Sequence, residues 1–249
     1  MTVNPIIWRV EHFEEIDSTN TYLKDHAEGA PEGLVVLADF QQSGRGRLDR
    51  AWSSPPRASL LCSVLLRPAL EADQLQLVVV AVALALRTAL ERLSGLRAAL
   101  KWPNDLVVEG RKLAGLLAEV VSSSMGVAVV VGFGVNLTYE GPEGVTATSV
   151  RRETGLTIAP RALLDIVLEE LEPLRAALDS EEGRAGLRAN YERALSTLGL
   201  AVRVEQHHGE LLGTAIGIDR RGQLLVDVEG DVVTVEVGDV VHLRAMDAQ

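Results

Sequence analysis

One long segment that is apolar on all sides most constrains the fold of this chain. Residues 75–93 carry Leu, Val or Ala at 14 of 19 positions and end just before Gly95. A helix that is apolar all round is buried on every side, so other elements must cover it. The uncharged apolar part of this segment, residues 74–86, has 13 residues and is too short to cross a bilayer. The segment therefore predicts the central helix of a globular domain.

Shorter segments on both sides of this helix have the patterns of strands and of other helices. Ser18 can cap a short helix that runs to about Ala27, and two more helices are predicted over 160–177 and 181–195. Strands are predicted over 34–38, 60–66, 100–102, 106–108, 113–121 and 127–136. This mixture predicts an α+β fold in which helices pack on a mixed sheet.

After Gly199 the pattern changes to short alternating segments that glycines separate. Five strands are predicted, over 201–205, 211–218, 223–229, 232–237 and 240–244. Five short strands within about 45 residues indicate a small β-barrel. The best boundary between the two parts is near Leu198.

Composition excludes several classes of protein. Of 249 residues, 47% are apolar and 24% are charged, as in globular proteins and unlike disordered ones. The single cysteine, Cys62, cannot form an internal disulfide, and the charged N-terminal residues offer no apolar core for a signal peptide. A net charge of −11 disfavours a protein that binds nucleic acid through general electrostatics. We therefore expect a cytoplasmic protein with no membrane partner.

A cationic island interrupts this acidic background. Residues 43–57 hold four arginines and one acid, Asp49, within a connection of about 20 residues between two predicted strands. Connections of that length are usually functional or mobile. Gly44 and Gly46 allow a close backbone approach, and arginine forks grip carboxylates or phosphates through paired hydrogen bonds. The island indicates a site for a small anion; it lacks the Walker spacing, and a solvated basic loop is the alternative.

Two further motifs can bring charge to such a site. Lys101-Trp102-Pro103-Asn104-Asp105 ends a predicted strand, and a carboxylate there could hold Mg²⁺ for a nucleotide. The plainer interpretation of this motif is an Asx turn. Lys112, in the motif 111–117, lies at the mouth of the next strand, where its ammonium can reach a ligand. Lysines at hairpin turns are usually solvated, so this motif alone is weak.

The remaining motifs allow two interpretations each. Gly132 and Gly134 interrupt an apolar strand, which indicates close approach by a ligand or tight packing. Residues 18–20 are a helix start or a hydrogen-bonding pocket. Cys62 lies in an apolar strand and is a core thiol rather than a nucleophile, and His207-His208 are solvated rather than metal ligands. The chain has no zinc-ligand spacing and no nucleophile elbow.

Together and in this order, the motifs resemble those of the biotin–protein ligases, also called biotin–[acetyl-CoA-carboxylase] ligases. The resemblance covers residues from about 11 to 244. It is carried by Ser18-Thr19-Asn20, Gly44-Arg45-Gly46-Arg47 with Trp52, Lys101-Trp102-Pro103-Asn104-Asp105, Arg111-Lys112-Leu113-Ala114-Gly115 and Gly132-Phe133-Gly134-Val135-Asn136. It implies a catalytic domain for biotin and ATP in residues 1–198 and an SH3-like β-barrel domain in residues 199–249.

The resemblance also implies an activity. Such enzymes join the carboxylate of biotin to the α-phosphate of ATP, forming biotinyl-5′-AMP and pyrophosphate. They then pass the biotinyl group to one lysine of a biotin carboxyl carrier protein or domain. Because two anions meet in the first step, fixed positive charge and Mg²⁺ must cancel their repulsion.

Matched positions assign roles to individual residues. The catalytic residues are Lys112, Arg47 and Asp105, of which Asp105 is also matched to Mg²⁺. The biotin-binding residues are Ser18, Thr19, Asn20, Gln41, Gly44, Arg45, Gly46, Arg47, Lys112 and Gly115. The nucleotide-binding residues are Arg47, Arg50, Trp52, Lys101, Asn104 and Asn136.

The chain departs from the family pattern at Leu48-Asp49, where members often carry Arg-Gly. Only 17 residues precede Ser18, so the resemblance is to the short class without an N-terminal DNA-binding domain. We therefore expect no specific DNA binding, and this class allows a homodimer. Two alternatives stay open: a lipoate or octanoate–protein ligase or transferase of the same architecture, and a non-catalytic, biotin-responsive regulator.

Overall fold

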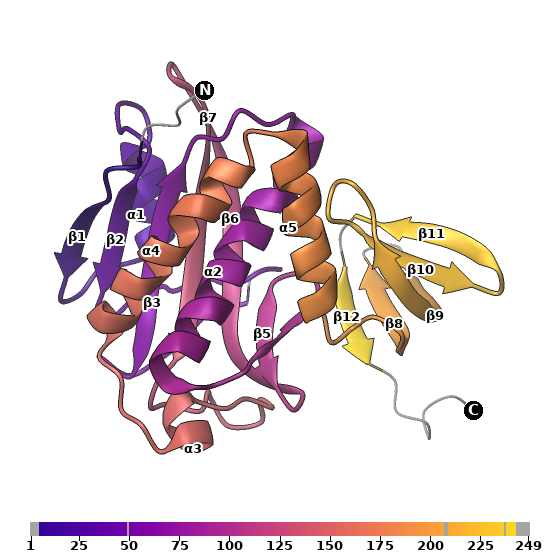
Figure 1. Ribbon diagram of the computed structural model, residues 1–249. Coiled ribbons are helices and arrows are strands. Elements are labelled where there is room, and N and C mark those ends of the chain that lie inside the picture. The colour runs from indigo at the N-terminus through magenta and orange to yellow at the C-terminus, as the bar shows by residue number, and fades with distance from the viewer. Residues whose placement is uncertain (1–4, 49, 207–208, 237, 243–249) are drawn as a thin grey trace.

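The computed structural model describes residues 5–48, 50–206, 209–236 and 238–242, and its chain forms two sheets (Figure 1). The first sheet has seven strands. In spatial order they are β1 (Arg9–Phe13), β2 (Leu34–Ala38), β3 (Ser59–Leu66), β7 (Gly126–Asn136), β6 (Arg111–Ser123), β5 (Asp105–Val108) and β4 (Ala99–Lys101). Strand β1 pairs in parallel with β2 and every other pair is antiparallel, so the predicted mixed sheet is confirmed.

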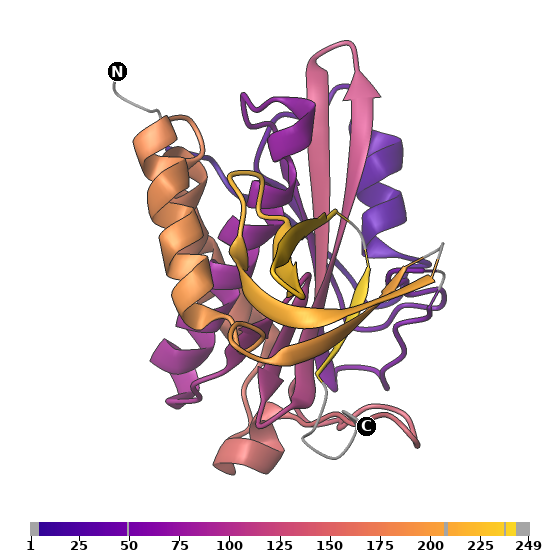
Figure 2. The same cartoon turned by 90° about the vertical axis from the view of Figure 1, so that its right-hand side faces the viewer.

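Helices cover both faces of this sheet. Helices α2 (Gln76–Ser94), α4 (Pro160–Ala177) and α5 (Glu181–Ala194) lie on one face, and α1 (Thr19–His26) lies on the other (Figure 2). Alternate strand residues follow this division: Val35 belongs to the core under α2, whereas Val36 packs with Leu23 of α1. The sheet therefore forms the middle layer of an α+β domain.

Helix α2 is the predicted central helix. Residues 77–86 of α2 are all buried, as the apolar sequence requires. The helix stops at Gly95, which adopts a left-handed conformation (φ 71°) and donates its backbone N–H to the carbonyl of Glu91. Glycine reaches this conformation without steric cost, which explains why the helix ends there.

Three short elements were not predicted from the sequence. They are β1, the 3₁₀ helix η1 (Ala72–Gln74) and α3 (Val150–Thr154). Strand β1 is an edge strand with charged, exposed side chains, so its sequence lacks the alternation of a half-buried strand. Helix α3 has five residues and depends on its cap, because the Ser149 side chain accepts a hydrogen bond from the Arg152 backbone.

The second sheet forms the C-terminal domain. Its strands, in spatial order, are β11 (Asp231–Val235), β10 (Leu224–Val228), β9 (Gly209–Ile218), β8 (Ala201–Gln206) and β12 (Asp239–His242). The sheet curves strongly (Figure 2). Its edge strands β11 and β12 do not pair with each other within the described residues, so the predicted barrel is not closed there. The predictions for Asp49, His207-His208, Val237 and residues 243–244 lie outside the described residues.

Hydrogen bonds join the two domains beside the functional site. Trp102, buried at the end of β4, donates from Nε1 to the carbonyl of Gly222 at 3.1 Å. Its backbone N–H donates to the Thr197 hydroxyl, which also contacts Nε2 of His242 at 3.2 Å. These bonds hold the end of β12 and the turn at Gly222 close to the end of β4. None of the described helices combines the length and apolarity needed to cross a membrane.

Candidate active site

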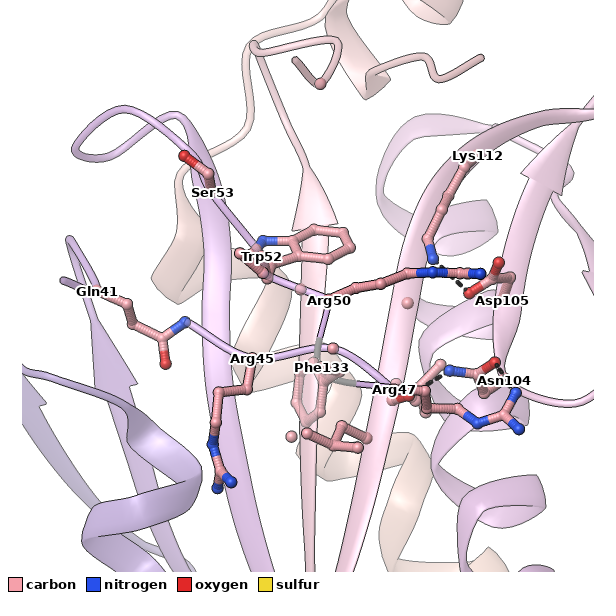
Figure 3. A pocket seen from close by; sticks show the side chains of 18 of the residues that line it. Gln41, Arg45, Arg47, Arg50, Trp52, Ser53, Asn104, Asp105, Lys112 and Phe133 are labelled. Atoms are coloured by element: carbon pink, nitrogen blue, oxygen red, sulfur yellow. Dashed lines mark hydrogen bonds and ion pairs between the residues drawn. The ribbon is translucent and has the colours of Figure 1, made fainter. Parts of the chain in front are cut away.

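A cavity of about 540 Å³ brings the predicted motifs together. Of the site residues predicted from the sequence, all line this cavity except Gly44 and Lys101. They come from the start of α1, the loop between β2 and β3, the β4–β5 turn, and strands β6 and β7 (Figure 3). Segments up to 118 residues apart in the sequence, from Ser18 to Asn136, therefore share one space.

The two exceptions lie beside the cavity. The Gly44 carbonyl accepts a hydrogen bond from the Trp52 backbone at 2.9 Å, and a Cβ at Gly44 would lie 2.4 Å from the Trp52 carbonyl. Gly44 therefore shapes the loop that carries the arginines. Lys101 ends β4. Burial lowers the pKa of His242 in the C-terminal domain, and the positive charge of Lys101 lowers it further.

Glycines in the floor of the cavity make room for side chains of the site. Gly115 pairs with Gly134 between β6 and β7. A Cβ at Gly134 would lie 2.3 Å from Cε2 of Trp52, and one at Gly115 would lie 3.0 Å from Nζ of Lys112. The contact at Gly134 is too short for a side chain, so this glycine is needed where Trp52 lies against β7; the contact at Gly115 falls on the flexible end of the Lys112 side chain.

One end of the cavity is polar, and the charge of Arg45 at this end is balanced by Glu119. Ser18 is the N-cap of α1, and its side chain accepts from the Thr21 backbone. The next residue, Thr19, donates to Oε1 of Gln41 from its backbone N–H at 2.8 Å and from its hydroxyl at 3.1 Å. These bonds occupy the carboxamide oxygen, so Nε2 of Gln41 is left as a donor.

The other end of the cavity is strongly cationic. Nζ of Lys112 lies 2.7 Å from the carboxylate of Asp105 and 5.8 Å from the centre of a Trp52 ring. Arg47 donates to Oδ1 of Asn104 at 3.3 Å, and burial lowers the pKa of its guanidinium. Arg50 extends from the same loop toward Asp105 (Figure 3). The arrangement concentrates positive charge where a ligand anion can replace protein carboxylates.

Sequence reasoning missed the carboxylate that balances this charge. Asp239, at the start of β12, lies 2.6 Å from Nη2 of Arg50 and 3.4 Å from Nη1 of Arg47. The backbone carbonyl of Gly238 also accepts from Arg47 at 3.3 Å. A single acid in a short strand carries no sequence signal for a contact with residues about 190 positions away.

Much of the remaining lining is apolar. The residues that sequence reasoning did not select include Ala51, Ser53, Cys62, Leu116, Leu117, Phe133, Gly141, Pro142, Val145 and Ala147. Cys62 is buried and free, and burial raises the pKa of its thiol. A thiol that stays protonated is a poor nucleophile, so the prediction of a core thiol is confirmed.

The described side chains of the cavity do not form a metal-binding site by themselves. No group of three or more His, Cys, Asp or Glu side chains within the described parts of the chain is placed to hold a metal ion. Asp105 and Asp239 are the acids that line the cavity, and both are paired with cations. Mg²⁺ commonly binds through one or two carboxylates plus substrate phosphates, so such a donor set suits an ion that arrives with a nucleotide.

A cavity with a neutral polar end and a cationic end suits an acid whose carboxylate meets a nucleotide phosphate, and comparison with known proteins assigns the class of ligase to which such a site belongs. Residues 12–136 match the biotin/lipoate A/B protein ligase family, and residues 197–243 match the biotin protein ligase C-terminal domain. The chain therefore belongs to the biotin/lipoate A/B protein ligase family, and within it to the biotin protein ligases.

Individual relatives agree with this placement. The biotin–[acetyl-CoA-carboxylase] ligase of Mycobacterium tuberculosis is 36% identical over 95% of this chain and 90% of its own. The bifunctional ligase/repressor BirA of Escherichia coli is 32% identical over 92% of this chain and 72% of its own. The solved biotin protein ligase from Aquifex aeolicus in complex with biotin and ATP is 28% identical, with a TM-score of 0.82 over 95% of this chain and 99% of its own.

Proposed function

We propose that this protein activates biotin with ATP to biotinyl-5′-AMP and then transfers the biotinyl group to a lysine of a biotin carboxyl carrier protein or domain. The observation that carries the proposal is that one cavity joins a neutral hydrogen-bonding end to a cationic end. Biotin has a cyclic urea at one end and a carboxylate at the other, so it fits this polarity. Residues 1–198 form the catalytic domain in this proposal, and residues 199–249 form the C-terminal domain.

The neutral end is the proposed site of the urea ring. Nε2 of Gln41 is free to donate to the urea carbonyl, because Thr19 occupies Oε1. Ser18 and Asn20 complete this part of the lining, and Gly115, which lies beside Lys112, is proposed to contact biotin farther along the cavity. Lipoate and octanoate carry no urea, so these polar groups would be left without partners, which is costly in a buried site.

The cationic end is the proposed meeting place of the carboxylate and the α-phosphate. Lys112 and Arg47 lie along the lining where fixed positive charge offsets the repulsion between two anions, and Arg45, which is paired with Glu119, lines the cavity on the Gln41 side (Figure 3). Arg47 and Lys112 are paired with carboxylates, so the incoming anions replace Asp239 and Asp105 as their partners. Because the cations are already held in place, little reorganisation opposes the reaction.

Nucleotide contacts are proposed for Arg50, Trp52, Asn104 and Asn136. Nε1 of Trp52 is buried and has no hydrogen-bond partner within the described residues, so it is a donor that a ligand can satisfy. Mg²⁺ enters with ATP as part of the substrate, and Asp105 and Asp239 would hold it there. Bound Mg²⁺ supplies further positive charge to the phosphates.

The two chemical steps balance without a covalent enzyme intermediate. In the first, an oxygen of the biotin carboxylate bonds to the α-phosphorus of ATP and pyrophosphate leaves. In the second, the amine of the acceptor lysine bonds to the acyl carbon, AMP leaves and one proton is released. Positioning and charge supply the rate enhancement.

Transfer to a carrier domain tests the proposal. The protein is incubated with an unmodified biotin carboxyl carrier domain, biotin and MgATP, and the carrier's mass is followed. We expect a single addition of one biotinyl group that requires both biotin and ATP. A variant of the carrier with its acceptor lysine replaced by arginine is the control. Modification with lipoate or octanoate in place of biotin would contradict the proposal.

A further inference from the structure

Glu119 lies outside the cavity but is bonded to residues that line it. It sits on β6 opposite Val130, on the face of the sheet that α1 covers. Its carboxylate accepts from Nδ2 of Asn20 at 2.9 Å, Nζ of Lys24 at 2.7 Å and Nη2 of Arg45 at 2.6 Å. Burial raises the pKa of Glu119, but these donors outweigh it and the pKa is lowered, so the carboxylate is charged at neutral pH.

A charged carboxylate fixes the orientation of the Asn20 carboxamide. A carboxylate can only accept hydrogen bonds, so the Asn20 nitrogen must face Glu119. The same nitrogen also donates to the carbonyl of Leu117 at 3.2 Å. The Asn20 oxygen is thereby turned the other way, toward the hydroxyl of Ser63 at 2.6 Å.

This orientation sets the direction of the next hydrogen bonds. Ser63 is fully buried on β3 and has one proton, which it donates to the Asn20 oxygen. The Thr19 hydroxyl lies 2.6 Å from the Ser63 oxygen and 3.1 Å from Oε1 of Gln41. Both of these neighbours are now acceptors, so the single Thr19 proton is committed to the protein.

The chain of bonds defines what the cavity offers a ligand. The Thr19 hydroxyl can only accept from a ligand, because its proton is already used. Gln41 offers its nitrogen as a donor, because its oxygen is occupied. A matching ligand has an N–H beside a carbonyl, which is the pattern of a cyclic urea.

We propose that Glu119 is a positioning residue that fixes the donor–acceptor polarity of the neutral end of the cavity through Asn20, Ser63 and Thr19. This inference rests on the proposed function, because it concerns recognition of the urea ring. Without Glu119, the Leu117 carbonyl is the remaining acceptor that holds the Asn20 nitrogen in place. The carboxamide then turns more easily, and Ser63 and Thr19 lose their fixed directions.

The test compares biotin with iminobiotin, in which a guanidine replaces the urea. Protonated iminobiotin has only N–H donors in its ring system, so a site that donates to the urea carbonyl discriminates against it. Adenylate formation with each compound is measured for the wild type and for Glu119→Ala, Glu119→Gln and Lys24→Met. Lys24→Met is the matched control, since it removes one ion pair of Glu119 but leaves its bond to Asn20.

We expect a variant that lacks a hydrogen-bond acceptor for Asn20 at position 119 to discriminate less between biotin and iminobiotin. Loss of a charge-assisted hydrogen bond should raise the KM for biotin about tenfold in Glu119→Ala and lower the preference for biotin by a similar factor. The kcat should change less than about threefold, because uniform binding rather than transition-state contact is lost. Glu119→Gln retains an acceptor for Asn20 and should keep most of the preference, and Lys24→Met should keep all of it.

Two outcomes overturn the inference. An unchanged preference in Glu119→Ala shows that Glu119 does not set the polarity. An equal loss in Glu119→Ala and Glu119→Gln assigns the effect to the ion pair with Arg45 instead. If Glu119→Ala does not fold, Ser63→Ala breaks the same chain and must show the same loss of preference. A wild type that does not adenylate biotin contradicts the proposed function itself, whereas an active wild type with unaltered variants contradicts only this inference.

Discussion

Nη2 of Arg50 lies 2.6 Å from a carboxylate oxygen of Asp239, and this ion pair joins the arginine-rich loop to the C-terminal domain. The same carboxylate also faces Arg47. One carboxylate therefore offsets only part of the charge of the two arginines, which keep a net positive charge. An acid from the second domain holds the loop in place until a stronger anion competes for it.

The first prediction concerns this contact. Asp239→Asn removes the negative charge, so the arginines repel one another and the loop opens more often. We expect trypsin to cleave after Arg47 and Arg50 several times faster than in the wild type, with fragments identified by mass spectrometry. Asp231→Asn, an exposed position on the same domain, is the control. Equal cleavage rates in the wild type and Asp239→Asn would show that the contact does not hold the loop.

The second prediction concerns Lys112. Lys112→Ala removes the cation proposed to face both anions, so adenylate formation should fall by about 10²–10³. Its ion pair with Asp105 is partly exposed and contributes little to stability, so the melting temperature should change by only about a few degrees. Adenylation rates and thermal unfolding are measured on the same preparation. A normal rate would make Lys112 a solvated turn residue.

The third prediction concerns Gly134, in the floor of the cavity. A Cβ at Gly134 would lie 2.3 Å from Trp52, so Gly134→Ala should displace the indole ring. Adenylate formation should fall at least about tenfold, because a misplaced contact in a preorganised site is costly. Gly29→Ala is the control, since no atom lies within 4 Å of its added Cβ. Wild-type activity in Gly134→Ala would exclude a role for the ring's position.

The fourth prediction concerns pH and stability. The pKa of folded Glu119 is lowered from its ordinary value of 4.5, so the folded state holds this proton less tightly than the unfolded state. The stabilisation is fully present above about pH 4.5 and is lost as the pH falls through the lower, folded-state pKa. The difference in the free energy of unfolding between the wild type and Glu119→Gln, measured with urea, should therefore become smaller as the pH falls. A difference that stays constant from neutral to acid pH would contradict the lowered pKa of Glu119. Glu143→Gln, at an exposed position, is the control.

Local patterns predicted most of the fold. The apolar run of α2, its glycine stop at Gly95 and the turn residues between strands each depend on neighbours in the sequence. The structure confirms the predicted strands, with shifts of one or two residues at their ends within the described residues. Strand β1 was missed because it is a charged edge strand that gains its order from pairing with β2.

The candidate site was predictable only where motifs are contiguous. Lys112, Arg47 and Thr19 stand in recognisable segments, and the structure brings those segments together. Glu119 and Asp239 lie outside them, and their contacts span 74 to 192 positions in the sequence. No local pattern predicts such contacts, because the fold of the whole chain creates them.

Biotin-dependent exchange of pyrophosphate into ATP tests directly whether the protein forms an adenylate of biotin. The reaction reports adenylate formation alone, so it needs no knowledge of the acceptor protein. We predict that labelled pyrophosphate enters ATP when biotin and Mg²⁺ are present, and that lipoate or octanoate does not replace biotin. Exchange supported by lipoate or octanoate but not by biotin would contradict the account.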